Sequence, residues 1–326
     1  MSGNPGSTHA LALAGGVGGA KLVVGLAHCL APGELVVAVN TGDDDEFHGL
    51  HVSPDLDTMM YTLAGLSNPE TGWGLDGDTF TALAMLRQYG ADTWFNLGDR
   101  DLATHIRRTQ LLKQGLTLSE VTAQLCGALG VVHEIAPMSD QPVRTVLETA
   151  EGPLSMQEYF VRQRAQPDVS AVRYVGAADA RPSPGLDDAL AQARILVICP
   201  SNPALSVQPI VEVSGMKERL VSFPGLRVAV SPIVGNDAVR GPAGRIMAGL
   251  GQEVSVVGVA RAYRDFCDAL VIDRQDEALA PAVADAGLRP VVTNTIMNSL
   301  QDRIDLARTV LSLAQSKNSL SSEGED

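Results

Sequence analysis

The alternation of short apolar segments with helical segments constrains the fold of this chain more than any other feature. The first two apolar segments, 9–13 and 35–39, are separated by a glycine-rich turn and a helix-like stretch at 14–27. Further apolar segments of strand length recur later, at 194–199, 226–230, 268–272 and 288–292. Strands joined through helices pair in parallel, so the pattern predicts an α/β fold with a doubly wound, mostly parallel, Rossmann-like sheet.

The sequence between these two groups of strands has a different pattern. Four segments carry Leu, Ala and Met at helical spacing, namely 56–66, 78–90, 100–114 and 117–130. Residues 131–176 are instead β-rich and polar, and strands are expected at 143–149 and 171–175. We therefore predict a helical insertion followed by a small β-rich excursion.

This pattern divides the chain into predicted parts. Residues 1–55 and 177–314 form a Rossmann-like nucleotide-binding core, and 56–176 form the insertion with its β region. The polar segment 315–326 is expected to be a flexible tail.

Charge and composition disfavour several classes of protein. With 24 Lys and Arg against 38 Asp and Glu, the net charge is −14, so clustered basic residues for nucleic acid are not expected. No apolar stretch approaches the roughly 20 residues that span a bilayer, and the first residues lack a signal-peptide pattern. The four cysteines include no CxxC pair and are typical of reduced core thiols. We expect a cytoplasmic protein with small-molecule substrates, and no nucleic-acid or membrane partner.

The glycine-rich turn after the first strand is the first candidate ligand site. It contains Gly15, Gly16, Gly18 and Gly19. Glycines allow the backbone to approach a phosphate, and the following helix offers unpaired N–H donors. The pattern is neither a P-loop nor the dinucleotide fingerprint, because Lys21 stands where the third glycine belongs. Asn40 replaces the acidic residue that holds the ribose of NAD, which disfavours a nicotinamide-dependent oxidoreductase. A tight turn without a ligand is the alternative.

Carboxylates are concentrated directly after the second strand, at the edge where open α/β sheets bind ligands. Four of them lie in a short loop and at a helix start: Asp43, Asp44, Asp55 and Asp57. Hard oxygen ligands suit Mg²⁺, which retains waters and bridges to phosphates. Two alternatives stay open here. An acidic run is typical of a solvated loop, and Asp55 or Asp57 could simply cap a helix.

Polar residues also follow later strands and open one of the helices. Ser201 and Asn202 come after the strand that ends at 199, and 231–237 follows the strand that ends at 230. Arg100 stands at a helix entrance, where it could hold an anionic or planar ligand or form surface ion pairs. Because the carboxyl ends of parallel strands meet at one edge, the strand-end loops and the glycine turn are expected to form one nucleotide site.

Seven segments in order resemble one family, the 2-phospho-L-lactate transferases (CofD, called FbiA in actinobacteria). They are 15–22, 40–44, 54–58, 97–106, 136–140, 200–203, and 231–236 with 241–244. The resemblance implies an Mg²⁺-dependent enzyme that transfers a phosphorylated three-carbon acid from a guanosine-diphosphate-linked donor. The acceptor would be the ribityl hydroxyl of 7,8-didemethyl-8-hydroxy-5-deazariboflavin, and GMP would leave, in the biosynthesis of coenzyme F-420.

The resemblance also implies roles for individual residues. Deazaflavin contacts are implied at Asp57 and Arg100, and metal-linked, catalytic carboxylates at Asp44 and Asp57. The guanine nucleotide is expected at Gly15, Gly16, Gly18, Gly19, Lys21, Ser201, Asn202, Gly235, Asn236 and Gly244. The acidic run departs from the family, since Phe47 comes later than the usual aromatic residue, and which Asp of 43–45 binds the metal stays open.

Several alternatives remain at this point. A nucleotide-sugar-binding regulator of the YvcK type would bind its ligand without turnover, but segments 54–58 and 98–101 favour the enzyme. The sequence does not distinguish phosphoenolpyruvate, 2-phospho-L-lactate and phosphoglycerate as the transferred unit. Family members suggest a homodimer.

Overall fold

A seven-stranded parallel sheet forms the centre of the molecule. A computed structural model describes residues 9–235, 237–238 and 241–322, and over these residues the strand order is β14–β13–β10–β9–β1–β2–β5. All paired strands of this sheet are parallel. They are β1 (Ala10–Ala14), β2 (Leu35–Val39), β5 (Glu134–Pro137), β9 (Ile195–Ile198), β10 (Leu226–Val230), β13 (Ala269–Asp273) and β14 (Arg289–Thr293). The predicted doubly wound α/β fold is confirmed, and the order of strands reverses between β1 and β9.

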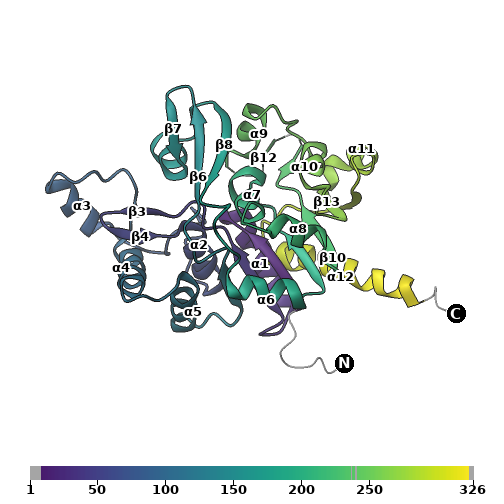
Figure 1. Ribbon diagram of the computed structural model, residues 1–326, viewed down its shortest axis with the longest axis horizontal. Coiled ribbons are helices and arrows are strands. Elements are labelled where there is room, and N and C mark those ends of the chain that lie inside the picture. Colours follow the sequence, from purple (N-terminus) through teal and green to yellow (C-terminus); the bar gives the residue numbers. More distant parts are fainter. Residues whose placement is uncertain (1–8, 236, 239–240, 323–326) are drawn as a thin grey trace.

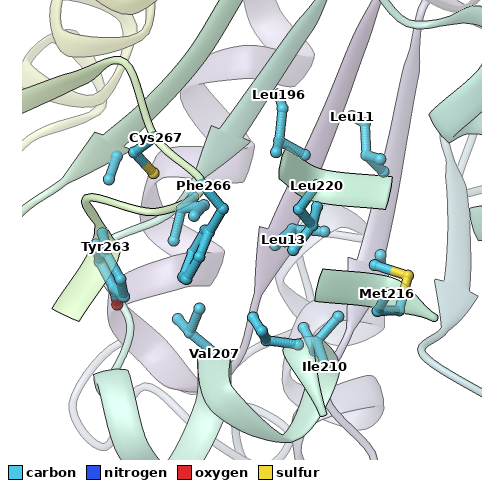
Figure 2. Packing of buried hydrophobic residues seen from close by; sticks show 14 of the residues in the cluster. Leu11, Leu13, Leu196, Val207, Ile210, Met216, Leu220, Tyr263, Phe266 and Cys267 are labelled. Atoms are coloured by element: carbon cyan, nitrogen blue, oxygen red, sulfur yellow. The ribbon is translucent and has the colours of Figure 1, made fainter. Parts of the chain in front are cut away.

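One face of the sheet is covered by helices from the second half of the chain. Side chains alternate along a strand, so Leu11 and Leu13 of β1 point into this layer. In Figure 2, Ile210, Leu220 and Phe266 lie against the strands in the same layer. The helices are α6 (Pro184–Gln192), α7 (Gln208–Val211), α8 (Met216–Val221), α10 (Val256–Tyr263) and α11 (Ala280–Asp285).

The opposite face is covered mainly by the first and last helices. Ala10, Ala12 and Ala14 point into this layer, which contains residues of α1 (Gly16–Cys29), α2 (Pro54–Leu63), α5 (Leu118–Ala128) and α12 (Leu300–Ser322). Helices α1 and α12 approach so closely that a Cβ on Gly25 would lie 2.1 Å from the carbonyl oxygen of Arg303. The first helix therefore packs against both the sheet and α12, which also contacts β9 and β10, and its N-terminus lies at the edge of the sheet.

The chain leaves the sheet after β2 and returns to it only at β5. This excursion begins with a hairpin of β3 (Asp45–Phe47) and β4 (Leu50–Val52) and continues through α2, α3 (Thr81–Gln88), α4 (Asp99–Lys113) and α5. The hairpin and α3 lie at the opposite end of the molecule from the C-terminal part of α12 (Figure 1). The four predicted helical segments are observed, but the second half of the acidic run forms β3 instead of a loop.

Strand β5 differs from the sequence-based expectation. The sequence predicts that residues 134–137 belong to the β-rich excursion, but they form the edge strand of the central sheet and pair with β2 from Val36 to Val39. Only four residues long, β5 ends at Pro137, whose missing N–H is tolerated at an edge. The predicted domain boundaries otherwise stay a prediction.

A small antiparallel sheet follows β5. It consists of β6 (Arg144–Thr149), β7 (Gly152–Ser155) and β8 (Val169–Val175), and it carries a π-helical turn, η1 (Glu158–Arg162). The sheet and η1 pack against two elements of the second half of the chain, the π-helical turn η2 (Pro203–Val207) and α9 (Ala243–Gly249). The contact joins Leu147, Tyr159 and Val169 with Leu205 of η2 and Ile246 of α9. This apolar contact fixes the small sheet above the ends of the central strands.

The remaining short elements lie in the C-terminal half of the chain. They are the short hairpin β11 (Ile233–Val234) and β12 (Asp237–Ala238) and the 3-10 turn η3 (Arg274–Leu279). Helix α12 continues to Ser322, so residues 315–322 of the predicted flexible tail are helical, and the last four residues of that tail lie outside the described residues. Over the described ranges, none of the helices has the length and apolar character needed to cross a membrane.

Candidate active site

The glycine turn lies at the carboxyl end of β1, where the strand order reverses. Gly16 has φ +62°, a left-handed conformation that favours glycine. Gly18 lies directly against the loop after β9, because a Cβ at this position would be 2.4 Å from the carbonyl oxygen of Pro200. The turn therefore brings two neighbouring strand ends into contact.

A cavity of about 620 Å³ opens at this edge of the sheet. Its volume falls within the range of small-molecule sites. We divide its wall by the strands that supply it. The hydroxyl half comes from the segments after β9, β10 and β14 and comprises Ser201, Asn202, Ser231 and Thr295. The carboxylate half comes from the excursion after β2 and comprises Asp43, Asp55, Asp57, Asp101 and His105. The glycine turn lies between the two halves.

The hydroxyl half is built from short contacts between side chains and backbone. Ser201 Oγ donates to the carbonyl of Gly15 (2.8 Å) and accepts from its N–H (3.2 Å), which ties the loop after β9 to the glycine turn. The Oδ1 of Asn202 accepts from the N–H groups of Ala204 and Leu205, so that its side chain opens η2. These contacts fix the wall with side chains that carry no formal charge.

Three carboxylates lie near the glycine turn: Asp43 and Asp55 belong to the carboxylate half, and Asp44 lies behind its wall. Asp55 accepts from the N–H of Gly16 (2.8 Å) and from Asn40 Nδ2 (3.0 Å). Asp44 Oδ2 accepts from Ser53 Oγ (2.8 Å) and lies 3.0 Å from His51 Nε2. The Oδ1 atoms of Asp43 and Asp44 are buried and have no hydrogen-bond partner.

Burial strongly affects two of these carboxylates. It raises the pKa of Asp55 to about 6. Burial, together with repulsion from Asp55, raises the pKa of Asp43 well above its usual value. Both shifts mean that the charged forms are poorly solvated, so a cation bound beside these groups would stabilise them.

A second group of polar residues lies deeper in the carboxylate half. Arg108 is fully buried on α4 and donates through both terminal nitrogens to the two carboxylate oxygens of Asp57. His105 lies between Asp57 and Asp101, with its Nε2 3.2 Å from Asp101 Oδ2. Tyr61 donates its hydroxyl to Asp101 Oδ1 (2.7 Å). Residues from α2 and α4 therefore form one buried network.

Charge within this network is largely balanced. Burial disfavours the charged guanidinium, but the charge and hydrogen bonds of Asp57 outweigh it and raise the pKa of Arg108. Burial raises the pKa of Asp101, but interactions with His105 and the Tyr61 hydroxyl outweigh it and lower that pKa overall. Asp57, Asp101 and His105 bring ligand atoms within 4.8 Å of one another, yet both oxygens of Asp57 already bind Arg108. The carboxylates near the glycine turn therefore fit a metal better than this network does.

Aromatic side chains border the carboxylate half. Phe95 and Phe160 line the cavity, as does Trp73, which is 48% exposed. Phe95 stacks on Phe47 with ring centres 4.0 Å apart and planes 5° from parallel. This part of the wall offers flat apolar surface beside fixed carboxylates, an arrangement that suits a planar ring with a polar chain.

Most residues predicted for the site line the cavity. They are Gly15, Gly16, Gly18, Lys21, Asp57, Ser201 and Asn202. Gly19 lies just behind the wall, where a Cβ would be 2.7 Å from Ser201 Oγ, and Asp44 is buried behind Ser53 and His51.

Other predicted residues lie away from the wall. Arg100 is exposed at the start of α4, and its Nη1 donates to the carbonyl of Asp76 (2.9 Å). Gly235 donates its N–H to Asp276, and Gly244 is buried in α9; neither lines the cavity. Asn236 lies outside the described residues. The proposed ligand contacts of these four residues stay predictions.

The sequence interpretation missed Arg108 and the segment that contains Thr295. Asp101, His105 and Arg108 stand at positions i, i+4 and i+7 of α4, so they share one face of the helix, and this spacing is visible in the sequence. Thr295 follows β14 and binds Asp273 through its N–H (2.8 Å). Thr295 follows the end of β14, as the other loops of the site follow the ends of β1, β9 and β10, so its place in the site could have been predicted from the sequence.

Comparison with known proteins agrees with this arrangement. The family model described as 2-phospho-L-lactate transferase CofD matches residues 10–309. The chain belongs to the 2-phospho-L-lactate transferase family. This confirms the resemblance found in the sequence and identifies the protein as a transferase of that family.

Relatives within the 2-phospho-L-lactate transferase family carry two names. A phosphoenolpyruvate transferase of Kitasatospora aureofaciens is 40% identical over 94% of this chain and 97% of its own length. A 2-phospho-L-lactate transferase of Methanosarcina mazei is 39% identical over 91% of this chain and 97% of its own length. Identities this similar do not separate the two kinds of transferase.

A solved structure shares the fold of this 2-phospho-L-lactate transferase family member. The crystal structure of a UPF0052 family protein from Bacillus halodurans has a TM-score of 0.61 and covers 94% of this chain and all of its own. Its sequence is 13% identical, so the likeness supports the fold alone.

Proposed function

We propose that this protein transfers a phosphorylated three-carbon acid from a guanosine-diphosphate-linked donor to the ribityl hydroxyl of 7,8-didemethyl-8-hydroxy-5-deazariboflavin. GMP leaves, and the product is a precursor of coenzyme F-420. The observation that carries the proposal is the two-part wall of one cavity in a member of this transferase family. One part suits a nucleotide, and the other suits a planar acceptor with a hydroxylated chain.

The donor is expected to lie across the glycine turn and the hydroxyl half. Backbone N–H groups at the start of α1 and the side chain of Lys21 can neutralise phosphate oxygens. The nucleoside would then extend over the ends of β9 and β10, along Ser201, Asn202 and Ser231. This placement puts the reacting phosphorus between the two halves.

Mg²⁺ is expected at the carboxylates near the glycine turn. Asp43 and Asp55 fit the ion, because both are buried oxygen donors that line the cavity, and Asp43 keeps a buried oxygen without a partner. We place the metal on these two residues, with its other ligands from water and the donor phosphates, rather than on Asp57, whose oxygens bind Arg108. Asp44 lies behind them, outside the cavity wall. When bound, the ion supplies positive charge to the phosphate oxygens of the donor.

The acceptor is expected in the carboxylate half. Its ring would lie against Phe95, Phe160 and Trp73, and its ribityl hydroxyls would donate to Asp57 and Asp101. Asp57 then orients the terminal hydroxyl for in-line attack, because phosphoryl transfer depends mostly on positioning and charge stabilisation. The bond to the leaving GMP breaks as the new phosphodiester forms.

Incubation of the purified protein with Mg²⁺, the deazaflavin and each candidate donor tests this function. The donors are the guanosine-diphosphate-linked forms of 2-phospho-L-lactate, phosphoenolpyruvate and phosphoglycerate. We expect GMP release by liquid chromatography and, by mass spectrometry, a deazaflavin whose added mass identifies the transferred unit. Binding of a nucleotide sugar without any product in all three reactions would instead support a regulator of the YvcK type. The homodimer and the cytoplasmic location also stay predictions.

A further inference from the structure

A buried arginine organises the wall of the carboxylate half without lining the cavity. Arg108 Nη1 donates to Asp57 Oδ2 at 3.1 Å, Nη2 donates to Asp57 Oδ1, and Nη1 also lies 3.3 Å from His105 Nδ1. Arg108 is 1% exposed, whereas Asp57 and His105 both line the cavity. Arg108 therefore contacts two residues of the cavity wall, Asp57 and His105, from the side that faces away from the cavity.

This contact bears on the tautomer of a neutral His105 ring. A guanidinium has only donors, so the Nδ1 that faces Arg108 must be the acceptor. The ring proton of a neutral His105 then lies on Nε2, which is 3.2 Å from Asp101 Oδ2 but makes no hydrogen bond in this structure. Asp101 accepts instead from the Tyr61 hydroxyl. Arg108 therefore orients Asp57 and His105 directly, and Tyr61 orients Asp101.

We propose that Arg108 is a positioning residue for the acceptor: it fixes Asp57 and His105 in the one arrangement that receives the hydroxyls of the ribityl chain. The inference rests on the proposed function. The fork of a guanidinium can bind both oxygens of Asp57 and the His105 ring at the same time, whereas the single ammonium group of a lysine cannot reproduce that geometry.

The adjacent arginine provides a matched control. Arg107 is exposed on the same helix, and its Nη1 donates only to the neighbouring Gln110 among the contacts described for it. Arg107→Lys and Arg108→Lys are the same chemical change one residue apart. We expect Arg108→Lys to lower kcat/KM for the acceptor by about 100-fold, the scale of a misplacement of about 1 Å at the reacting group, because lysine keeps the charge but not the fork. Arg107→Lys should stay within about twofold of the wild type, since exposed pairs contribute little.

Two readouts separate positioning from a general structural role. GDP binding in the presence of Mg²⁺, measured by calorimetry, should be unchanged in Arg108→Lys, because the hydroxyl half does not contact Arg108. In Arg108→Ala, added guanidinium should restore at least about tenfold of the lost turnover, whereas ammonium should not, because only the fork binds both oxygens of Asp57.

The outcomes are distinct. Equal kinetics for the Arg107→Lys and Arg108→Lys variants, or equal losses of donor and acceptor affinity in Arg108→Lys, would overturn the inference while wild-type turnover kept the proposed function intact. Absence of turnover by the wild type with every donor would overturn the proposed function itself.

Discussion

The two halves of the cavity are built by different physical means. In the hydroxyl half, the side chains Ser201, Asn202, Ser231 and Thr295 carry no formal charge and follow directly from strands of the central sheet. In the carboxylate half, the wall consists of ionisable groups on helices and loops inserted between β2 and β5. Under the proposed function, the nucleotide of the donor binds at a rigid sheet edge through backbone groups, while recognition of the acceptor depends on buried charges that hold one another in place.

The largest expected effect is in the carboxylate half. Asp57→Ala should lower turnover by about 10³-fold or more, because a fixed hydrogen-bond acceptor for the attacking hydroxyl is lost. It also leaves Arg108 buried without its carboxylate partner, which should cost about 3–5 kcal/mol of stability. Steady-state kinetics and urea unfolding measure the two effects.

A double variant separates them. Replacing Asp57 by Leu and Arg108 by Met removes both charges, so stability should recover while turnover stays lost. Recovery of turnover in this double variant would show that Asp57 has no direct role with the acceptor and would remove the distinction between the halves.

A smaller effect is expected from the backbone contact beneath the hydroxyl half. In Gly18→Ala, the new Cβ would lie 2.4 Å from the carbonyl oxygen of Pro200, a backbone atom that cannot move aside alone. We expect a loss of about 1–3 kcal/mol in stability and weaker GDP binding, with acceptor binding retained. Gly127→Ala is the control, because a Cβ at this position in α5 meets no atom within 4 Å. Weaker acceptor binding with normal GDP binding would contradict the assignment of the halves.

The smallest effect is a pH dependence where the halves meet. The pKa of Asp55 is raised to about 6, so a proton competes with Mg²⁺ below that pH. We expect Mg²⁺ affinity to fall about tenfold between about pH 7 and about pH 5, as measured by calorimetry.

The sign of the effect on stability follows from the same shift. The pKa of an aspartate is ordinarily 3.8, as in the unfolded chain, and in the folded protein that of Asp55 is about 6. Between these two pH values folded Asp55 binds more protons than unfolded Asp55, so the metal-free protein loses stability as the pH rises through this range. Added Mg²⁺ should reverse the loss above about pH 6. Asp55→Asn should remove the part of this dependence that comes from Asp55, while Asp43, whose pKa burial also raises, contributes a loss of the same sign. An unchanged pH profile in that variant would assign the titration to another group.

The sheet and the hydroxyl half could largely be predicted from the sequence. Each strand such as β1 or β10 is a continuous apolar run, and the rule that ligands bind where strand order reverses places Gly16 and Ser201 together. Strand β5 could not be predicted as part of the sheet, since four residues give little signal and its partner β2 is far away in the sequence.

The carboxylate half was harder to predict because burial of a charged residue is not local information. Arg107 and Arg108 are adjacent and chemically identical, and only the packing of α4 against its neighbours, with Asp57 of α2 among them, decides which of them is buried. Arg100 illustrates a different case: motif resemblance predicts a ligand contact, the structure places the side chain on the exposed first turn of α4 and outside the cavity wall, and the contact stays a prediction. The helical spacing of Asp101, His105 and Arg108 was the better guide.

The return of the chain at β5 has a consequence for how the molecule assembles. Pairing of β5 with β2 joins residues nearly a hundred positions apart, so closing that loop carries a larger entropic cost than joining strands linked by a single helix. The inner pair of β1 and β9 joins residues still further apart, Ala10 with Ile195, and the whole excursion lies within that loop. Pairing of β5 with β2 therefore shortens the stretch of chain that the centre of the sheet has to close.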